Sequence, residues 1–208
     1  MDIPLRERNA MLEAAGLVPA YPERRLNDAE ATPFRNAIRS MLNAQEPYPA
    51  YVINRWWEVV DVNAAGHRMF PDAGTGTASA IDAFLAPGGY REAIENFAAV
   101  GWTFLHRLRR EVADAGPDER LEALLTRAED YMRDVPPPAD ADLGSDLVVC
   151  PRLRVGDCVI STVSMVARFG HARDVTLDEL RIELVFPADD EAEAFFRAAA
   201  EAAGESDA

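Results

Sequence analysis

The first part of the chain alternates between amphipathic helical segments and proline-punctuated connections. Residues 3–15 place Leu5, Met11 and Leu12 on one side at helical spacing, and Gly16 is a good C-terminal stop. The linker 17–33 follows. A second helix is then predicted, with Asp28 or Thr32 as its cap, and Pro47 and Pro49 end it. Its apolar face comprises Phe34, Ile38, Met41 and Leu42.

The segment 47–70 predicts a β-hairpin and a capped helix. Residues 50–54 and 57–62 are rich in β-branched and aromatic side chains, with Asn54 and Arg55 at the turn. On a strand, Trp56 and Trp57 would point to opposite faces. Asn63 is well placed to cap a helix at 64–70, because its side chain can accept from a free backbone N–H.

The middle of the chain is predicted to be helical. The Gly/Thr-rich stretch 74–79 is expected to be a flexible loop, and residues 81–87 a helical turn or two. The longest helix is predicted over Tyr90–Ala113 and a second over 118–134, because their apolar residues recur every three or four positions. A stiff acidic connection, 135–146, follows.

After this connection the apolar period changes from helical spacing to two. Alternation predicts three antiparallel strands over 147–155, 158–169 and 180–186, each with one buried face. The predicted buried faces comprise Val159, Val163, Met165 and Phe169, and then Leu180, Ile182, Leu184 and Phe186. A final helix is predicted over Asp190–Ala203.

The order of these elements indicates an α+β fold. Two strands, then helices, then three strands and a helix can form a two-layer arrangement if the first hairpin joins the later meander. We therefore predict a five-stranded antiparallel sheet with helices packed on one face, plus an N-terminal helical extension, an arrangement in which PAS-like domains are also built.

Charge excludes one class of partner. The chain has 36 acidic and 21 basic residues, a net charge of −15, and no dense basic cluster. DNA binding draws most of its affinity from cations that neutralise phosphates, so this chain is not expected to bind DNA by itself. Every basic residue is arginine, which excludes a Schiff-base or P-loop lysine.

Neither a membrane segment nor an export signal is expected. No apolar run approaches the roughly 18 residues of a membrane span, and the charged N-terminus has no apolar signal region. A cytoplasmic protein is therefore expected. Cys150 and Cys158 are interpreted as buried free thiols, with a disulfide as the alternative.

We expect no metal site, no cofactor and no enzymatic activity. His67, His106 and His171 lie in three separate segments, without the spacing of helical metal ligands. Ser161 and Ser164 lie in strand-like sequence without a nucleophile-elbow motif. Arg107, Arg109 and Arg110 could hold an anion, but a solvated helix side paired with Glu111 or Asp114 is the simpler interpretation.

Several blocks, in order, resemble a family of bacterial transcription regulators. These are IPLRERNAMLEAAG at 3–16, VPAYPERRLND at 18–28, EPYPAYVINRWWEVVDVNAAGHRMF at 46–70 and DVTLDELRIELVFPAD at 174–189. Together they are similar to regulators with an Xre-type helix-turn-helix followed by an MmyB-like ligand-binding domain. In that family the first block ends the DNA-binding domain, and the ligand-binding domain is PAS-like.

The resemblance implies a domain division. Residues 1–16 would be the last-helix remnant of a helix-turn-helix domain, 17–46 a linker and helix, and 47–204 the PAS-like ligand-binding domain. DNA would be met only through a helix-turn-helix domain absent from this chain.

The resemblance also implies a ligand-sensing regulatory function with an apolar or fatty-acid-like small molecule bound between sheet and helices. A carboxylate would be met by Arg109 or His106. The residues predicted to line this site are Trp57, Phe84, Trp102, Leu105, His106, Arg109, Val163, Met165, Ile182 and Leu184.

Two alternatives stay open. Trp57 and Trp102 could serve core packing or an interface rather than a ligand. The whole chain could be a ligand-free dimerisation or protein-interaction module in which residues 3–46 form the platform. A homodimer is expected in either case.

Overall fold

The sheet joins strands from both halves of the chain. The computed structural model describes residues 3–73, 78–88, 90–139 and 148–206, so most of the predicted loop 74–79 and much of the connection 135–146 lie outside the described residues. Its strands are β1 (Ala50–Ile53), β2 (Val59–Val62), β3 (Arg152–Val155), β4 (Cys158–Ala167) and β5 (Arg181–Pro187). They form a five-stranded sheet in the order β2-β1-β5-β4-β3, with every neighbour antiparallel. The first hairpin therefore joins the later meander, and the α+β, PAS-like fold is confirmed.

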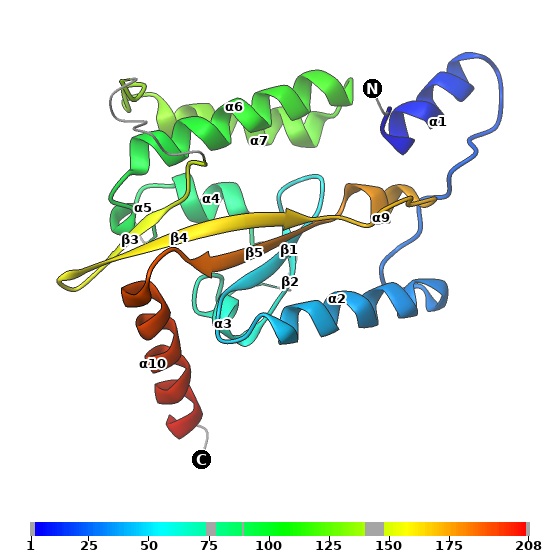
Figure 1. Ribbon diagram of the computed structural model, residues 1–208. Coiled ribbons are helices and arrows are strands. Elements are labelled where there is room, and N and C mark those ends of the chain that lie inside the picture. The colour runs from blue at the N-terminus through cyan, green and yellow to red at the C-terminus, as the bar shows by residue number, and fades with distance from the viewer. Residues whose placement is uncertain (1–2, 74–77, 89, 140–147, 207–208) are drawn as a thin grey trace.

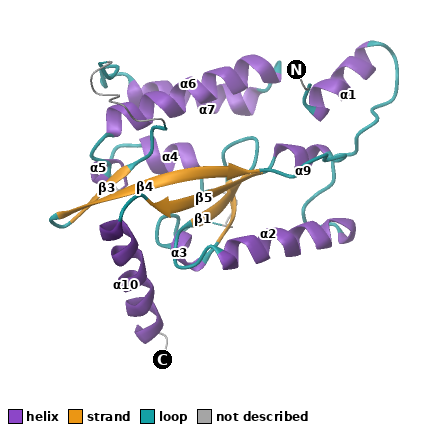
Figure 2. Ribbon diagram, viewed as in Figure 1, coloured by secondary structure: helices purple, strands orange, loops and turns teal. Residues whose placement is uncertain are grey.

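One face of the sheet carries the main core. It is covered by α4 (Ala80–Leu85), α5 (Tyr90–Ala93), α6 (Phe97–Ala115) and α7 (Glu119–Met132), whereas α3 (Ala64–His67) lies at the ends of β1 and β2, near α2 (Figures 1 and 2). Leu105 and Leu108 of α6 and Leu121 and Leu124 of α7 are buried in it. These residues recur at helical spacing, so each helix buries one apolar stripe.

The N-terminal helical extension reaches the opposite face. There α2 (Thr32–Ala44), which follows a short 3₁₀ turn (Ala29–Ala31), packs Ile38 and Leu42 near Val52 and Ile182. At the sheet's other end α10 (Asp190–Ser206) buries Phe196 against Ile160. Two further helices, α1 (Leu5–Ala14) and α9 (Val175–Glu179), lie beyond the ends of β4 and β5 (Figure 1). The apolar pattern of the sequence did not indicate α9.

The prediction of a single long helix from Tyr90 to Ala113 is wrong in one respect, because the helix is interrupted between α5 and α6. Ile94 forms an isolated β-bridge with Leu153 of β3. The Asn96 side chain accepts from the backbone N–H of Arg152 and donates to the carbonyl of Cys150, both at 2.9 Å. The backbone N–H of Glu95 donates to the carbonyl of Arg152 at 2.8 Å instead of to a helical carbonyl, so the contact with β3 interrupts the helix.

Trp57 lies in the β1–β2 turn rather than on a strand, which corrects the predicted hairpin. Its φ is +61°, and the Asn54 side chain accepts from the N–H groups of Trp56 and Glu58, both at 3.0 Å. This Asn-centred turn directs the Trp57 indole into the core, where only 1% of the residue is exposed.

Asn63 caps α3 as predicted. Its Oδ1 accepts from the N–H of Gly66 at 2.8 Å and from that of Ala50 at 2.9 Å. Its amide donates to the carbonyls of Tyr48 and Leu42 at 2.8 and 3.2 Å. The side chain therefore joins α2, β1 and α3 as well as capping a helix.

The predicted buried face of β4 is wrong. Val163 and Met165 are 41% and 59% exposed, whereas Ile160 and Thr162 are buried. β4 lies beside β5 but beyond the cover of α2, so its apolar side on that face meets solvent. Cys158 is exposed, not buried, and both cysteines are free thiols.

β5 differs from its prediction because it is covered on both faces. Ile182 is buried toward α2, as expected, but Arg181 and Glu183 on the opposite face are only 3% and 6% exposed. Alternation of charged and apolar residues normally marks a half-solvated strand. Here the charged side faces α6.

Candidate functional site

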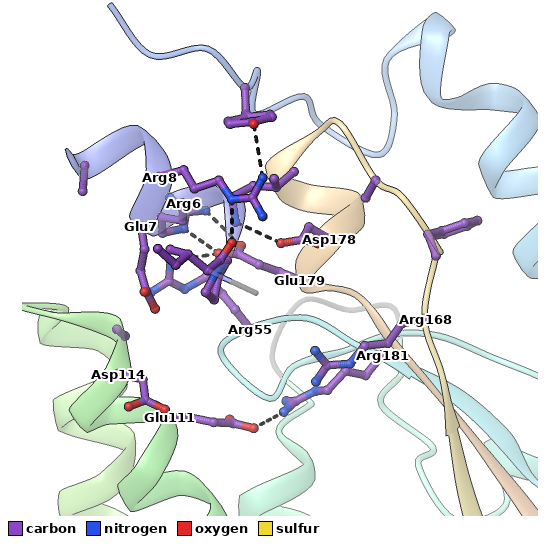
Figure 3. Close-up of a pocket in the computed structure, with 18 of the residues that line it drawn as sticks. Arg6, Glu7, Arg8, Arg55, Glu111, Asp114, Arg168, Asp178, Glu179 and Arg181 are labelled. Atoms are coloured by element: carbon purple, nitrogen blue, oxygen red, sulfur yellow. Dashed lines mark hydrogen bonds and ion pairs between the residues drawn. The ribbon is translucent and has the colours of Figure 1, made fainter. Parts of the chain in front are cut away.

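A cavity of about 890 Å³ lies where α1 meets the rest of the molecule. We call it the α1 cavity. Side chains from α1, the β1–β2 turn, the C-terminal end of α6, the segment 168–173 and α9 surround it (Figure 3). Its apolar lining includes Leu5, Leu121 and Phe169. Its size is in the range of small-molecule sites.

The α1 wall is held by arginine–carboxylate pairs. Arg6 donates from Nε and Nη2 to the two carboxylate oxygens of Glu179 at 2.6 and 3.0 Å, and it also pairs with Glu23 of the linker. Arg55 of the β1–β2 turn reaches Glu179 at 3.2 Å and Asp118 at 2.7 Å. Glu179 of α9 therefore joins α1 to the β1–β2 turn through two arginines.

The pKa values of three of these groups, Arg6, Glu23 and Asp118, are shifted. The hydrogen bond from Arg6 lowers the pKa of Glu23, and the bond to Glu179 raises the pKa of Arg6 despite its partial burial. Burial alone would raise the pKa of Asp118, but its backbone bonds at the start of α7 and the charge of Arg55 lower it. Each of these groups is charged at neutral pH.

The inner wall is a buried charge cluster around Trp57. Glu111 accepts from Arg181 Nη1 at 2.5 Å, from Trp57 Nε1 at 2.6 Å and from Arg107 Nε at 3.2 Å. The guanidinium groups of Arg181 and Arg107 lie over the indole ring, 4.5 and 4.9 Å from its centroid. Arg107 also reaches Glu183 at 3.4 Å.

Burial dominates ionisation in this cluster. It lowers the pKa of Arg181 and raises the pKa of Glu183, although opposite charges nearby act against both shifts. Arg181 donates to Glu111 and to the Asn54 carbonyl, but its Nε has no acceptor among the described residues. The cluster therefore places an incompletely satisfied cation on the cavity wall.

A second cavity of about 430 Å³ lies between the linker, α2 and α9. It shares Phe169, His171, Ala172 and Arg173 with the α1 cavity. The ring of Phe169 meets that of Phe34 on α2, with a centroid separation of 5.6 Å. The segment 168–173 thus separates two cavities and contacts both.

Three of the ten predicted ligand residues, Trp57, Phe84 and Leu105, lie in the main core. The ring of Phe104 bridges the first two, at centroid distances of 5.7 and 5.2 Å. Ring contacts therefore occupy this part of the space between sheet and helices.

Trp102, His106 and Arg109 lie on a different side of α6. The Trp102 indole donates to the carbonyl of Val135 at 3.1 Å, and its ring lies 5.7 Å from that of His106. Arg109 pairs with Glu129 of α7 at 2.8 Å, so this part of α6 forms helix–helix contacts.

The remaining four, Val163, Met165, Ile182 and Leu184, lie on the sheet face that carries α2. Met165 is opposite Leu184 in the β4–β5 register, and Ile182 packs near α2. No cavity on one side of the sheet can contact all ten residues. None of them lines the α1 cavity, and their contact with a ligand remains a prediction.

The residues of the α1 cavity were missed by sequence reasoning, although some of its signals were visible. DELRIELVFPAD contains Glu179 and Arg181, but the pattern showed only a strand with a charged side. Glu179 lies 173 positions from Arg6 and 124 from Arg55, so no local spacing reveals their convergence.

Neither a metal-ligand cluster nor a membrane-spanning helix is found among the described residues. No group of three or more His, Cys, Asp or Glu side chains there is arranged to hold a metal ion. Among the described helices, none combines the length and apolarity needed to span a bilayer.

Comparison with known proteins supports the resemblance seen in the sequence. A family model, that of the MmyB-like transcription regulator ligand binding domain, matches residues 34–199. A search of curated proteins finds no match. The match spans most of the chain and contains the entire sheet, from β1 to β5. The chain therefore belongs to the family of MmyB-like transcription regulator ligand-binding domains.

Proposed function

We propose that this domain senses a fatty-acid-like small molecule in the α1 cavity and relays occupancy through α1 to a DNA-binding domain, in cis or on a partner. Residues 1–16 would then be the last-helix remnant of the helix-turn-helix domain, and the cytoplasm would be the place of action. One observation carries the proposal: the α1 cavity has α1 as one wall and α6, α9 and the β1–β2 turn as the others.

The lining suits an amphipathic ligand better than a purely apolar one. Leu5, Leu121 and Phe169 offer apolar contacts, while Arg55 and Arg181 offer charged donors. Specific ligand sites commonly combine an apolar lining with a few polar groups that fix orientation. Glu111, Asp114 and Ala115 belong to α6, so a ligand here would still lie beside the long helix, at its C-terminal end.

Occupancy of the cavity can be relayed because the ligand would contact α1 differently in different positions of that helix. α1 is held to α9 through Arg6 and Glu179, and the N–H of Leu5 donates to Asp178 at 3.2 Å. A ligand that touches both sides of the cavity binds one position of α1 better than another and therefore favours it.

Titration calorimetry with dodecanoate tests the proposal. We expect saturable binding that is lost in Ala115→Trp, because the indole would occupy the cavity that Ala115 lines. Ala198→Trp on the exposed surface of α10 is the matched control and should bind normally. Absence of binding to the wild-type protein, or equal binding by both variants, would contradict the assignment of the site.

A second candidate is a homodimerisation module. Val163 and Met165 form an exposed apolar patch on the open face of β4, and an apolar sheet face is a suitable surface for a two-fold contact between copies of this chain. Light scattering of Met165→Glu tests it. A dimeric wild type and a monomeric variant are expected, whereas a dimeric variant would argue against this face.

A further inference from the structure

Two arginines face each other at the inner end of the α1 cavity. The β4–β5 register pairs Ala167 with Ile182, so one further step places Arg168 opposite Arg181. Residues opposite each other in antiparallel strands lie close together, and like charges there repel. Both side chains line the α1 cavity, and Figure 3 draws them on the same side of it.

The carboxylates around this pair do not balance it. Arg107 and Arg181 both bind Glu111, and Arg107 also reaches Glu183. Arg168 is exposed and has no ion-pair partner among the described residues. Three arginines thus share two carboxylates, which leaves one positive charge without a partner within the described cluster.

Arg181 carries a second, independent sign of a missing partner. The residue is 97% buried, and its Nε has no acceptor among the described residues. An unsatisfied buried donor on a cationic group is costly and rare in folded proteins. The nearby acids do not supply the acceptor, because Glu111 is reached through Nη1 and Glu183 accepts from Arg107 instead.

We propose that Arg168 and Arg181 form a binding site for the anionic headgroup, a carboxylate or a phosphate monoester, of the molecule held in the α1 cavity. The inference rests on the proposed function and adds the two residues that bind the headgroup, which therefore must be an acid rather than the corresponding alcohol, ester or amine. Glu7 and Asp114 lie on the other side of the cavity in Figure 3, so the headgroup points toward the strands. Arginine suits both headgroups because its donors match paired oxygens.

Ligands with the same ten-carbon chain and different headgroups measure the contribution of the headgroup alone. We expect the wild-type protein to bind decanoate or decyl phosphate at least tenfold more tightly than decanol, since a charge-assisted bond is lost in the alcohol. If only one of the two anions meets this threshold, that anion identifies the headgroup. If decanol and both anions bind equally, the inference is overturned while the proposed function stands, and if nothing binds, both fail.

Arg168→Gln localises the effect. The side chain is exposed and lacks an ion-pair partner in the described chain, so the variant is expected to fold normally. It should lose the preference for anions over decanol and retain decanol binding. Arg110→Gln, on the exposed side of α6 and away from the cavity lining, should keep the preference. An unchanged preference in Arg168→Gln, with the wild type selective, would overturn the site.

Discussion

Arg6 on α1 donates to both carboxylate oxygens of Glu179 on α9, at 2.6 and 3.0 Å. The same carboxylate accepts from Arg55 in the β1–β2 turn at 3.2 Å. The Glu179 side chain therefore links the N-terminal helix to the β1–β2 turn. Bidentate arginine–carboxylate pairs fix orientation as well as distance, so this pair sets the position of α1 over its cavity.

Glu179→Gln should loosen α1 without unfolding the domain. The substitution removes a charge shared by Arg6 and Arg55, and we expect a loss of about 1–3 kcal/mol in the free energy of unfolding. Hydrogen exchange should accelerate within 5–14 more than in the sheet, as mass spectrometry can measure. Arg197→Gln, which removes an exposed pair with Glu193 on α10, should change neither quantity by much. Unchanged exchange in α1 would show that Glu179 does not hold it.

Asn63→Ala should be among the most damaging substitutions on the sheet. The buried side chain makes hydrogen bonds to Ala50, Gly66, Tyr48 and Leu42. Its loss leaves buried backbone groups without a hydrogen-bond partner, and we expect about 3 kcal/mol of destabilisation in urea unfolding. Asn43→Ala, an exposed position on α2, is the control and should change stability by less than about 0.5 kcal/mol. Equal effects of both variants would contradict this role.

Gly66→Ala tests the close approach of α3 to the β1–β2 hairpin. A Cβ at this position would lie 2.9 Å from the carbonyl oxygen of Ala50 and would collide with Val62. The backbone of Ala50 cannot shift without disturbing β1, so we expect a loss of about 1–3 kcal/mol in the free energy of unfolding. At Gly170 an added Cβ meets no heavy atom within 4 Å, and Gly170→Ala should be nearly neutral. A neutral Gly66→Ala would mean that α3 packs less closely than described.

The raised pKa of Glu183 should make the free energy of unfolding depend on pH. Burial raises its pKa above the ordinary 4.5, so its protonated form favours the folded state. That contribution is complete below 4.5 and is lost as the pH rises through the folded-state pKa. Glu183→Gln cannot ionise, so its free energy of unfolding relative to wild type should increase as the pH is raised from 4.5 toward neutrality.

Glu23 provides the opposite case in the same experiment. The hydrogen bond from Arg6 lowers its pKa, so its contribution is present above the ordinary 4.5 and is lost as the pH falls. Glu23→Gln should therefore lose stability relative to wild type near neutral pH and approach it in acid. Identical pH profiles for both variants would refute these opposite shifts.

Local patterns were sufficient for much of the fold. Asn63 could be identified as a cap because its role depends on residues three positions away, and the helices of the main core follow from their apolar spacing. The order of the elements indicated that the first hairpin joins the later strands. The misassigned features depend on non-local contacts: α6 is separated from α5 by bonds between Asn96 and β3, and Trp57 leaves the strand in an Asn54-centred turn.

The candidate site could not be predicted for the same physical reason. Arg181 alternates with apolar residues as a solvated strand position does, and its burial is visible only once α6 covers β5. Its partner Glu111 is 70 residues away, and Arg6 is 173 residues from Glu179. Charged residues that pair across such separations have no local pattern, so the cavity emerges only from the packing of α1, α6 and α9.

Hydrogen exchange of the α1 segment 5–14 with and without saturating dodecanoate tests the central claim most directly. Calorimetry on the same sample establishes saturation. If the ligand binds in the α1 cavity and relays its occupancy through α1, protection in this segment should change clearly, while that of α10 stays constant. Confirmed binding with unchanged protection of α1 would contradict the claim, because a ligand that does not alter α1 cannot signal through it.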